Sequence, residues 1–254
     1  MTVPTIRATR SGTAGAPLLV LGPSLGTSTL VWEDAAALFG THFDILTWDL
    51  PGHGISPPAR ERFAVAELAD AVLDLVGGRR FYYAGVSLGG AVGLELALRH
   101  PERLDRLAMI CSLARFGEAS SWEERATLVR AQSTSVLVGA SASRWFSAGS
   151  IARLPEVTGR LLHALADADD ESYALCCEAL AVYDLRGELC ELSRPLLAIS
   201  GHDDPVAPPE AIAELAAEAP DGRATDVTDT GHLASAEQPA IIASLLIDFF
   251  RKDG

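Results

Sequence analysis

The chain of 254 residues lacks the features that mark membrane and secreted proteins. No apolar run reaches the roughly 18–20 residues needed to span a bilayer. The first residues, MTVPTIRATRSG, do not contain the apolar core of a signal peptide. Four cysteines in a chain of this length do not suggest a disulfide framework. We therefore expect a cytoplasmic protein without membrane contact, with its cysteines as buried or half-buried thiols.

Basic residues are also scarce. The 20 Lys and Arg are outnumbered by 34 Asp and Glu, which gives a net charge of −14. Nucleic acids and anionic membrane surfaces are bound through basic patches, so neither is an expected partner. If the substrate is an anion, a local Arg or Lys must bind it. The chain has no H-E-x-x-H, no CxxC pair and no G-x-G-x-x-G after a strand, so no metal and no cofactor is expected.

Short apolar runs alternate with helical patterns along most of the chain. Continuous apolar runs are typical of parallel strands that are covered on both faces. They predict strands at 17–22, 43–50, 81–86, 106–112, 195–201 and 224–229, with an antiparallel edge strand at 5–10. Helices are predicted at 63–78, 91–100, 208–220 and 237–252. The alternation predicts an α/β fold whose mostly parallel sheet of seven or eight strands is flanked by helices.

Residues 113–185 interrupt this alternation. They contain helical patterns and no convincing strand. About seventy residues are too many for one crossover connection, although ordinary crossover helices are the alternative. We expect a helical cap at 113–185, inserted into an α/β core made of residues 1–112 and 186–254.

One serine lies at the apex of a glycine-rich turn. The segment Gly85-Val86-Ser87-Leu88-Gly89 fits G-x-S-x-G, with a predicted strand before it and a helix beginning around Leu88. Such a turn strains the serine backbone and requires small neighbours. The hydroxyl then projects above the sheet, beside the positive end of the helix. We predict Ser87 as a nucleophile; a simple strand-to-helix turn is the alternative.

A serine hydroxyl needs a base to take its proton. The chain offers six histidines: His42, His53, His100, His163, His202 and His232. His232 follows the last predicted strand, at the sheet edge where open α/β folds bind their ligands. His100 and His163 fall in helical patterns and His42 precedes a strand, so we expect surface or packing roles for them. His232 is the predicted base.

A carboxylate should orient the imidazole and stabilise its charged form. The segment ISGHDDPVAPP follows the preceding strand and contains Asp203 and Asp204. We predict Asp204, directly before Pro205, as the acid, and Asp203 as a turn or exposed carboxylate. The chain order Ser, Asp, His is the order found in α/β-hydrolases.

Acyl transfer also needs donors for the oxyanion. We predict the backbone N–H of Leu88, which follows the nucleophile, and that of Leu25 in the loop LGPSLGTSTLVW. The turn DLPGHGIS (49–56) follows another strand. Asp49 and its glycines are expected to shape this loop, with a pocket-lining role for His53 as the alternative.

The chain resembles the α/β-hydrolases along nearly its whole length and, more narrowly, the 3-oxoadipate enol-lactonases of aromatic catabolism. The segments that carry this resemblance are PSLGTS (23–28), LPGHGIS (50–56), GVSLGGAVGLELALRHPERLDRL (85–107), RWFSAG (144–149), YALCCEALAVYDLR (173–186) and GHLASAEQP (231–239). Relatives commonly have Asn-Ser-Leu-Gly-Thr-Asp in the first loop, where this chain has Pro23 and Ser28.

The resemblance implies a serine hydrolase of the protocatechuate branch that cleaves a small-molecule lactone, 3-oxoadipate enol-lactone. That substrate carries a carboxylate, for which Arg144 is the predicted anchor and Arg186 the runner-up. Trp145 is the predicted aromatic wall of the pocket. A carboxylesterase, a carbon–carbon bond hydrolase, a perhydrolase and a triad-bearing receptor remain alternatives on this scaffold. Whether the chain forms homo-oligomers is left open.

Overall fold

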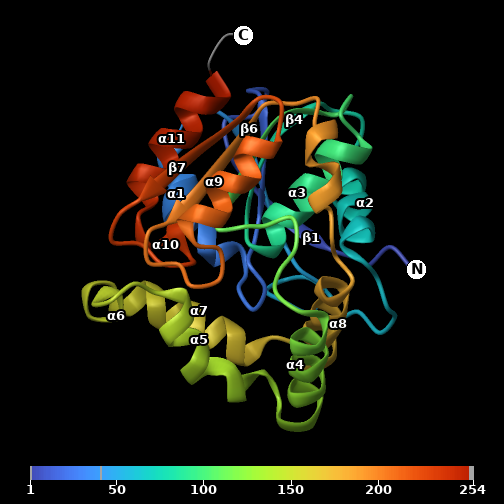
Figure 1. Ribbon diagram of the computed structural model, residues 1–254, viewed down its shortest axis with the longest axis vertical. Coiled ribbons are helices and arrows are strands. Elements are labelled where there is room, and N and C mark those ends of the chain that lie inside the picture. The colour runs from blue at the N-terminus through green and yellow to red at the C-terminus, as the bar shows by residue number, and fades with distance from the viewer. Residues whose placement is uncertain (1, 41, 252–254) are drawn as a thin grey trace.

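The computed structural model describes residues 2–40 and 42–251, which form a seven-stranded sheet with helices around it (Figure 1). The strand order is β1-β3-β2-β4-β5-β6-β7. The strands are β1 Arg7–Gly12, β2 Leu18–Gly22, β3 Asp44–Asp49, β4 Phe81–Val86, β5 Leu104–Ile110, β6 Leu196–Gly201 and β7 Gly222–Val227. All neighbours pair in parallel except β1, which runs antiparallel to β3. The predicted fold class is therefore confirmed, including the antiparallel strand at the edge.

Burial along the strands explains why the sequence pattern identified them. Every residue of β2, β3 and β6 is buried, because helices cover both faces of the sheet there. The edge strands β1 and β7 are mostly exposed and polar. Polar, charged edges of this kind discourage pairing with other chains.

The helices beside the sheet include four predicted ones, at 65–76, 88–99, 209–218 and 239–251, and others that were not predicted. They are α1 Glu33–Leu38, α2 Val65–Val76, α3 Leu88–Arg99, α9 Pro209–Glu218, α10 Ala234–Glu237 and α11 Pro239–Arg251, with 3₁₀ turns η1 Thr29–Trp32 and η3 Arg186–Glu191. The sequence pattern did not predict η1, α1 or α10. Each is short, so its apolar residues complete too few turns to show a helical period.

All the regular secondary structure described between β5 and β6 is helical. It contains α4 Ala119–Gln132, η2 Thr134–Leu137, α5 Val138–Trp145, α6 Ser150–Arg153, α7 Pro155–Asp167 and α8 Asp170–Ala181. Figure 1 shows these elements as a separate layer, in green and yellow, beyond one end of the sheet. We call them the cap helices. The boundaries at residues 113 and 185 stay a prediction.

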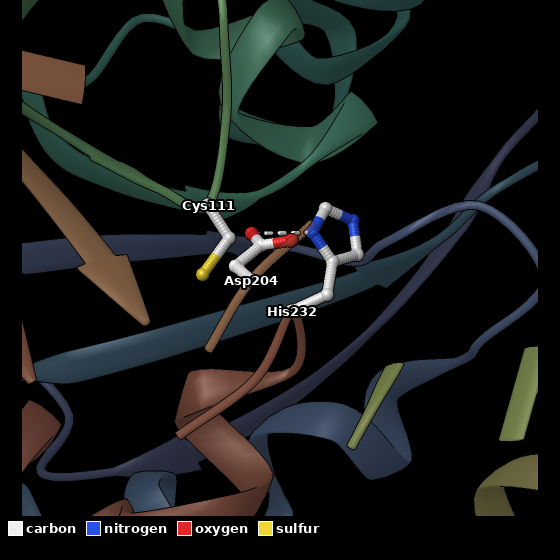
Figure 2. A group of neighbouring side chains, drawn as sticks. All are labelled: Cys111, Asp204 and His232. Atoms are coloured by element: carbon white, nitrogen blue, oxygen red, sulfur yellow. Dashed lines mark hydrogen bonds and ion pairs between the residues drawn. The ribbon is translucent and has the colours of Figure 1, made fainter. Parts of the chain in front are cut away.

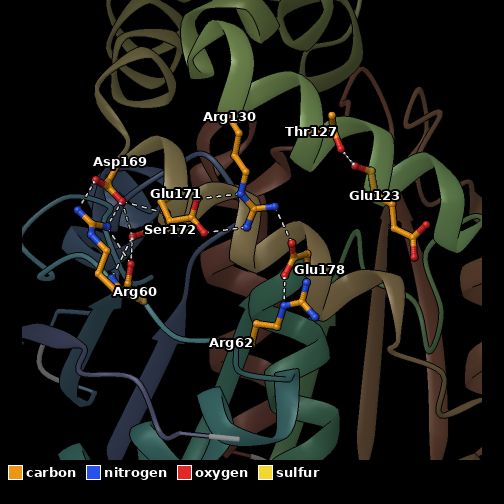
Figure 3. A network of polar contacts seen from close by, with 10 residues as sticks. Arg60, Arg62, Glu123, Thr127, Arg130, Asp169, Glu171, Ser172 and Glu178 are labelled. Atoms are coloured by element: carbon orange, nitrogen blue, oxygen red, sulfur yellow. Dashed lines mark hydrogen bonds and ion pairs between the residues drawn. The ribbon is translucent and has the colours of Figure 1, made fainter.

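Charged groups tie the cap helices to one another and to the loop before α2 (Figure 3). Arg60 in that loop makes two hydrogen bonds to the carboxylate of Asp169, the residue that caps α8. Arg130 of α4 binds both Glu171 and Glu178 of α8, at 2.7 and 2.6 Å. Arg62 also reaches Glu178. Isolated surface pairs contribute little, but a connected network holds the cap in one position over the core.

Two further expectations concern membranes and cysteines. None of the described helices is long and apolar enough to cross a membrane. Cys111, Cys176 and Cys177 are buried as expected, but the expectation was wrong for Cys190, which is exposed. Cys190 lies in η3, a single surface turn in which the buried side is taken by Leu189.

Candidate active site

The loops that carry the predicted site residues open at one edge of the sheet. The parallel pairing of β2 with β4 places Gly22 beside Gly85, so the loop after β2 and the turn after β4 leave the sheet together. The strand order reverses here, since β3 lies on one side of β2 and β4 on the other. Ligands of open α/β sheets bind at such a reversal. The loops after β6 and β7, which carry Asp204 and His232, emerge at the same edge.

Ser87 occupies the strained turn that its flanking glycines predicted. Its backbone has φ 54° and ψ −118°, a conformation that side-chain-bearing residues rarely adopt. A Cβ on Gly85 would overlap the backbone of Gly89, and one on Gly89 would lie 2.6 Å from the Gly22 carbonyl. The turn can therefore form only with glycine at both positions, and it holds Ser87 at the start of α3.

Hydrogen bonds on both sides keep this turn in place. The N–H of Ser87 donates to the Ile110 carbonyl of β5 at 2.9 Å. The Ser87 carbonyl accepts from the Ser112 hydroxyl at 2.8 Å. The N–H of Gly89 donates to the Pro23 carbonyl at 3.0 Å, which joins the turn to the loop after β2. The Ser87 backbone is therefore fixed against two neighbouring strands.

His232 and Asp204 form a buried pair (Figure 2). His232 Nδ1 donates to Asp204 Oδ2 at 2.8 Å, and both side chains are almost fully buried. A carboxylate only accepts hydrogen bonds, so Nδ1 carries a proton, and in the neutral ring Nε2 has the free lone pair. Nε2 lies on the side of the ring that faces away from Asp204 in Figure 2. The imidazole is thus set up to accept a proton.

The environment of Asp204 favours its ionised form. Burial acts to raise the pKa of this carboxyl, but His232 and the N–H groups of Val206 and Ala207 outweigh it, and the pKa is lowered. The Val206 N–H donates to Asp204 Oδ1 at 2.8 Å. Asp203, the other carboxylate that the sequence offered, is exposed. The geometry therefore favours Asp204 as the partner of the histidine.

Cys111 lies against this pair, which the sequence did not indicate. The ligand atoms of Cys111, Asp204 and His232 lie within 4.8 Å of one another, close enough for a metal site (Figure 2). Burial and the Asp204 charge raise the pKa of the Cys111 thiol, and a thiol binds metal only after losing its proton. His232 and Asp204 are moreover bonded to each other. We assign no metal to this group.

Two backbone N–H groups at this edge are free to bind an anion. Within residues 2–40 and 42–251, neither the Leu25 N–H nor the Leu88 N–H has a protein acceptor. Both residues are buried, and a buried N–H without an acceptor is rare because it costs free energy. The next two residues after Leu25 are satisfied, since Gly26 donates to His53 and Thr27 to Ser24. Leu25 and Leu88 are the donors that the sequence predicted.

His53 supports the loop that contains Leu25. Its Nδ1 donates to the Pro51 carbonyl at 2.8 Å, and its Nε2 accepts from the Gly26 N–H at 3.2 Å. Burial lowers the pKa of His53 to about 4, so the ring is neutral at physiological pH. It stacks on Tyr173 of α8, with ring centroids 6.1 Å apart. Its hydrogen bonds are to the loop backbone, a role the sequence did not single out.

The cap contacts the site at two places. A Cβ added to Gly26 would lie 3.3 Å from Trp145 and 3.2 Å from Tyr173, so both rings cover the loop after β2. The Trp145 carbonyl accepts from the Leu233 N–H, next to His232. Arg144, beside Trp145 at the end of α5, is exposed. Trp145 thus lies near the predicted residues, whereas the Arg144 side chain is exposed.

A buried carboxylate strengthens the second contact. Glu237 of α10 accepts from the Gly231 N–H at 2.6 Å with one oxygen and from the Ser147 N–H at 2.9 Å with the other. The Glu237 side chain thereby joins the loop that carries His232 to the cap. The sequence gave no signal for it, because α10 is only four residues long. Arg186, the runner-up anchor, is paired with Asp184 at 2.6 Å and is exposed.

Comparisons with known proteins agree with this arrangement. Residues 17–239 match the alpha/beta hydrolase fold family. The chain is 35% identical over 231 residues to 3-oxoadipate enol-lactonase 2 of Acinetobacter baylyi, covering 90% of this chain and 86% of that protein. It is 32% identical over 254 residues to the putative carbamate hydrolase RutD of Pseudomonas savastanoi, covering 93% and 94%.

A solved structure extends the likeness to three dimensions. The enol-lactonase from Burkholderia xenovorans LB400 superposes with a TM-score of 0.93 at 31% identity, covering 97% of this chain and 96% of that one. The chain therefore belongs to the α/β-hydrolase fold family and is an enzyme of the hydrolase class.

Proposed function

We propose that this protein hydrolyses 3-oxoadipate enol-lactone to 3-oxoadipate, as a step of protocatechuate catabolism. The proposal is supported by the buried Asp204–His232 pair at the sheet edge that also carries Ser87, together with full-length similarity to two proteins named enol-lactonases. The site offers a serine on a strained turn, an Asp204–His232 pair and two unpaired backbone donors.

In the first step, Ser87 Oγ attacks the lactone carbonyl and His232 Nε2 takes its proton. The buried Asp204 carboxylate stays ionised and stabilises the imidazolium that forms. The N–H groups of Leu25 and Leu88 bind the oxyanion of the tetrahedral intermediate. Removing one such donor typically costs about 3–4 kcal/mol of transition-state stabilisation.

Collapse of the intermediate breaks the ring ester bond. The leaving oxygen belongs to an enol, so it departs more readily than an alkoxide, takes the proton from His232 and becomes a ketone by tautomerisation. Water then attacks the acyl-enzyme while His232 accepts its proton. Departure of Ser87 Oγ, reprotonated by His232, releases the open-chain acid.

Carbamate hydrolysis is the second candidate, supported by the similarity to RutD, and simple ester hydrolysis is a third use of the same site. All three reactions would use the same serine, histidine and oxyanion donors. They differ in the leaving group and in the charge of the substrate.

A substrate panel separates these reactions. Purified protein is mixed with freshly generated enol-lactone, p-nitrophenyl esters and a small carbamate, and kcat/KM is measured for each. The proposal expects kcat/KM for the enol-lactone to exceed that for every other substrate by at least about 100-fold. Preference for the carbamate or for p-nitrophenyl esters would overturn it.

A further inference from the structure

The cap contacts the backbone on both sides of His232. On one side, the Leu233 N–H donates to the Trp145 carbonyl at 3.2 Å. On the other side, a Cβ added to Gly231 would lie 2.8 to 2.9 Å from backbone atoms of residues 145–147. Glycine at this position therefore lets the cap and the loop that carries His232 lie backbone against backbone.

Glu237 connects the same two segments through its side chain. One carboxylate oxygen accepts from the Gly231 N–H at 2.6 Å. The other accepts from the Ser147 N–H at 2.9 Å and lies 3.1 Å from the Ser147 hydroxyl. An ionised carboxylate accepts on both oxygens, and hydrogen bonds to a charged acceptor are the stronger ones. They compensate the burial of Glu237 and fix Gly231 relative to the cap.

The hydrogen bonds continue from Ser147 to a strained residue of the loop and into the cap. Asp229 has φ 55°, and its carbonyl accepts from the Ser147 hydroxyl at 3.0 Å. The same hydroxyl lies 2.8 Å from that of Ser150, which accepts from the guanidinium of Arg153 in α6 at 2.7 Å. Backbone strain persists only where the surrounding contacts impose it, and the cap supplies one of these contacts.

The cap segment 145–147 also reaches the loop after β2. A Cβ added to Gly26, which follows Leu25, would lie 3.3 Å from the Trp145 ring. Trp145 therefore contacts the loop of one predicted oxyanion donor with its ring and the loop of the predicted base with its carbonyl. A shift of this segment would displace both groups, and an error of about 1 Å in such a group can cost about 100-fold in rate.

We propose that Glu237 is a positioning residue, which holds His232 where it can take the proton of Ser87, and that it does so only while the cap segment 145–147 is docked. The carboxylate acts through the backbone of Gly231, directly before the histidine. The inference rests on the proposed function and deepens it, because it adds a cap contact to the groups that prepare the base.

The test replaces the Glu237 carboxylate with an amide. Glu237→Gln keeps the shape of the side chain, but its NH₂ group must face one of the two N–H donors. Glu214→Gln makes the same change at an exposed carboxylate of α9 and is the matched control. For each protein, kcat and KM are measured with freshly generated enol-lactone and with p-nitrophenyl acetate. The low-field proton NMR signal of His232 Nδ1–H is recorded as well, with Asp204→Asn to assign it.

We expect Glu237→Gln to lower kcat for both substrates about 10- to 100-fold, with KM within about threefold of wild type, since both reactions need the same base. The His232 signal should shift or broaden, because the imidazole is held less firmly against Asp204. Glu214→Gln should match wild type in kcat and in the NMR signal. An unchanged kcat, a loss confined to KM, or an unchanged His232 signal in a folded Glu237→Gln variant would overturn the positioning role.

Glu237→Asp decides the case if the glutamine variant does not fold. It keeps the charge on a side chain that is one methylene too short to reach the N–H groups of both Gly231 and Ser147, so kcat should fall about 10-fold. Wild-type kcat in this variant would contradict the proposal. Circular dichroism and thermal unfolding report folding, and a failure of both variants to fold would show a structural role only and would overturn the proposal too.

The two substrates separate this inference from the proposed function. If wild type cleaves p-nitrophenyl acetate but not the lactone, the lactonase proposal fails, and the role of Glu237 is still tested on the ester. If the lactone is cleaved and Glu237→Gln keeps the wild-type kcat, the lactonase proposal stands and the positioning role fails.

Discussion

At the scale of single residues, the site depends on side chains that are held in one chemical state. Asp204 is ionised because partners outweigh its burial, and His53 is neutral because burial dominates. The Asp204–His232 hydrogen bond fixes which imidazole nitrogen is free. Each state follows from contacts made by the folded chain, and each has a consequence that a substitution can reveal.

A matched pair of substitutions tests which of the adjacent residues Asp203 and Asp204 orients His232. Asp204→Asn should lower kcat for the enol-lactone about 10³- to 10⁴-fold, because an amide at this position no longer fixes the reactive tautomer of His232. Asp203→Asn changes the neighbouring, exposed carboxylate and should leave kcat within about twofold of wild type. Steady-state kinetics of the two variants decide the assignment, and a larger loss in Asp203→Asn would reverse it.

The lowered pKa of His53 predicts how the free energy of unfolding depends on pH. Its pKa is about 4 in the folded protein and about 6.5 when unfolded, so the unfolded state binds the extra proton between these values. The free energy of unfolding should therefore fall by roughly 3 kcal/mol as pH drops from 6.5 to 4. Urea unfolding at several pH values measures this fall.

His53→Gln should remove most of that pH dependence and should also lower kcat, because the Gly26 N–H loses its partner. His163→Gln alters an exposed histidine of α7 and serves as the control. A pH dependence in His53→Gln as steep as in wild type would show that other groups cause it.

At the scale of elements, the α/β order could be predicted from sequence and the cap contacts could not. Continuous apolar runs identified the inner strands, because a strand that is buried on both faces leaves that pattern in its own residues, whereas the polar edge strands β1 and β7 were placed by the alternation of strands and helices. The turn at Ser87 and the donor at Leu25 were also local, since each follows a strand by a fixed offset. Glu237 was missed, and for His53 only a pocket-lining role was considered, because their partners, Ser147 and Gly26, are far away in the chain.

The turn between β4 and α3 tolerates no side chain at its first glycine. Gly85→Ala would place a Cβ into the backbone of Gly89, so the turn must open. We expect a loss of at least about 2 kcal/mol in the free energy of unfolding and a fall in kcat as Ser87 moves. Gly187→Ala, where a Cβ meets nothing within 4 Å, should cost no stability. Chemical denaturation compares the two; equal stability would contradict the packing argument.

At the scale of the whole molecule, the cap helices lie over the sheet edge that carries the proposed reacting groups. Trp145 and Tyr173 of the cap cover the loop after β2. The network around Arg60 and Arg130 (Figure 3) ties the cap helices to the loop before α2. The carboxylate of Glu237 joins the loop that carries His232 to the cap. An acidic surface with local cations in the cap suits a small acidic substrate better than a nucleic acid or an anionic membrane.

The arrangement of cap and core could be predicted from the sequence only in part. It indicated a helical cap because seventy residues without a strand cannot be a single crossover. It named Arg144 as the expected anchor, but the network in which Arg130 of α4 binds Glu171 and Glu178 of α8 left no local pattern because α4 meets α8 only in the folded cap. Residues that act through the packing of distant helices leave no local pattern.

The central claim is that Ser87 attacks an enol-lactone, and the rate of loss of the lactone's ultraviolet absorbance tests it most directly. Wild type should hydrolyse the lactone, whereas Ser87→Ala should lose about 10⁴-fold or more in kcat. Ser120→Ala, at an exposed serine of α4, should retain the wild-type rate. Near wild-type turnover by a folded Ser87→Ala variant would contradict the account.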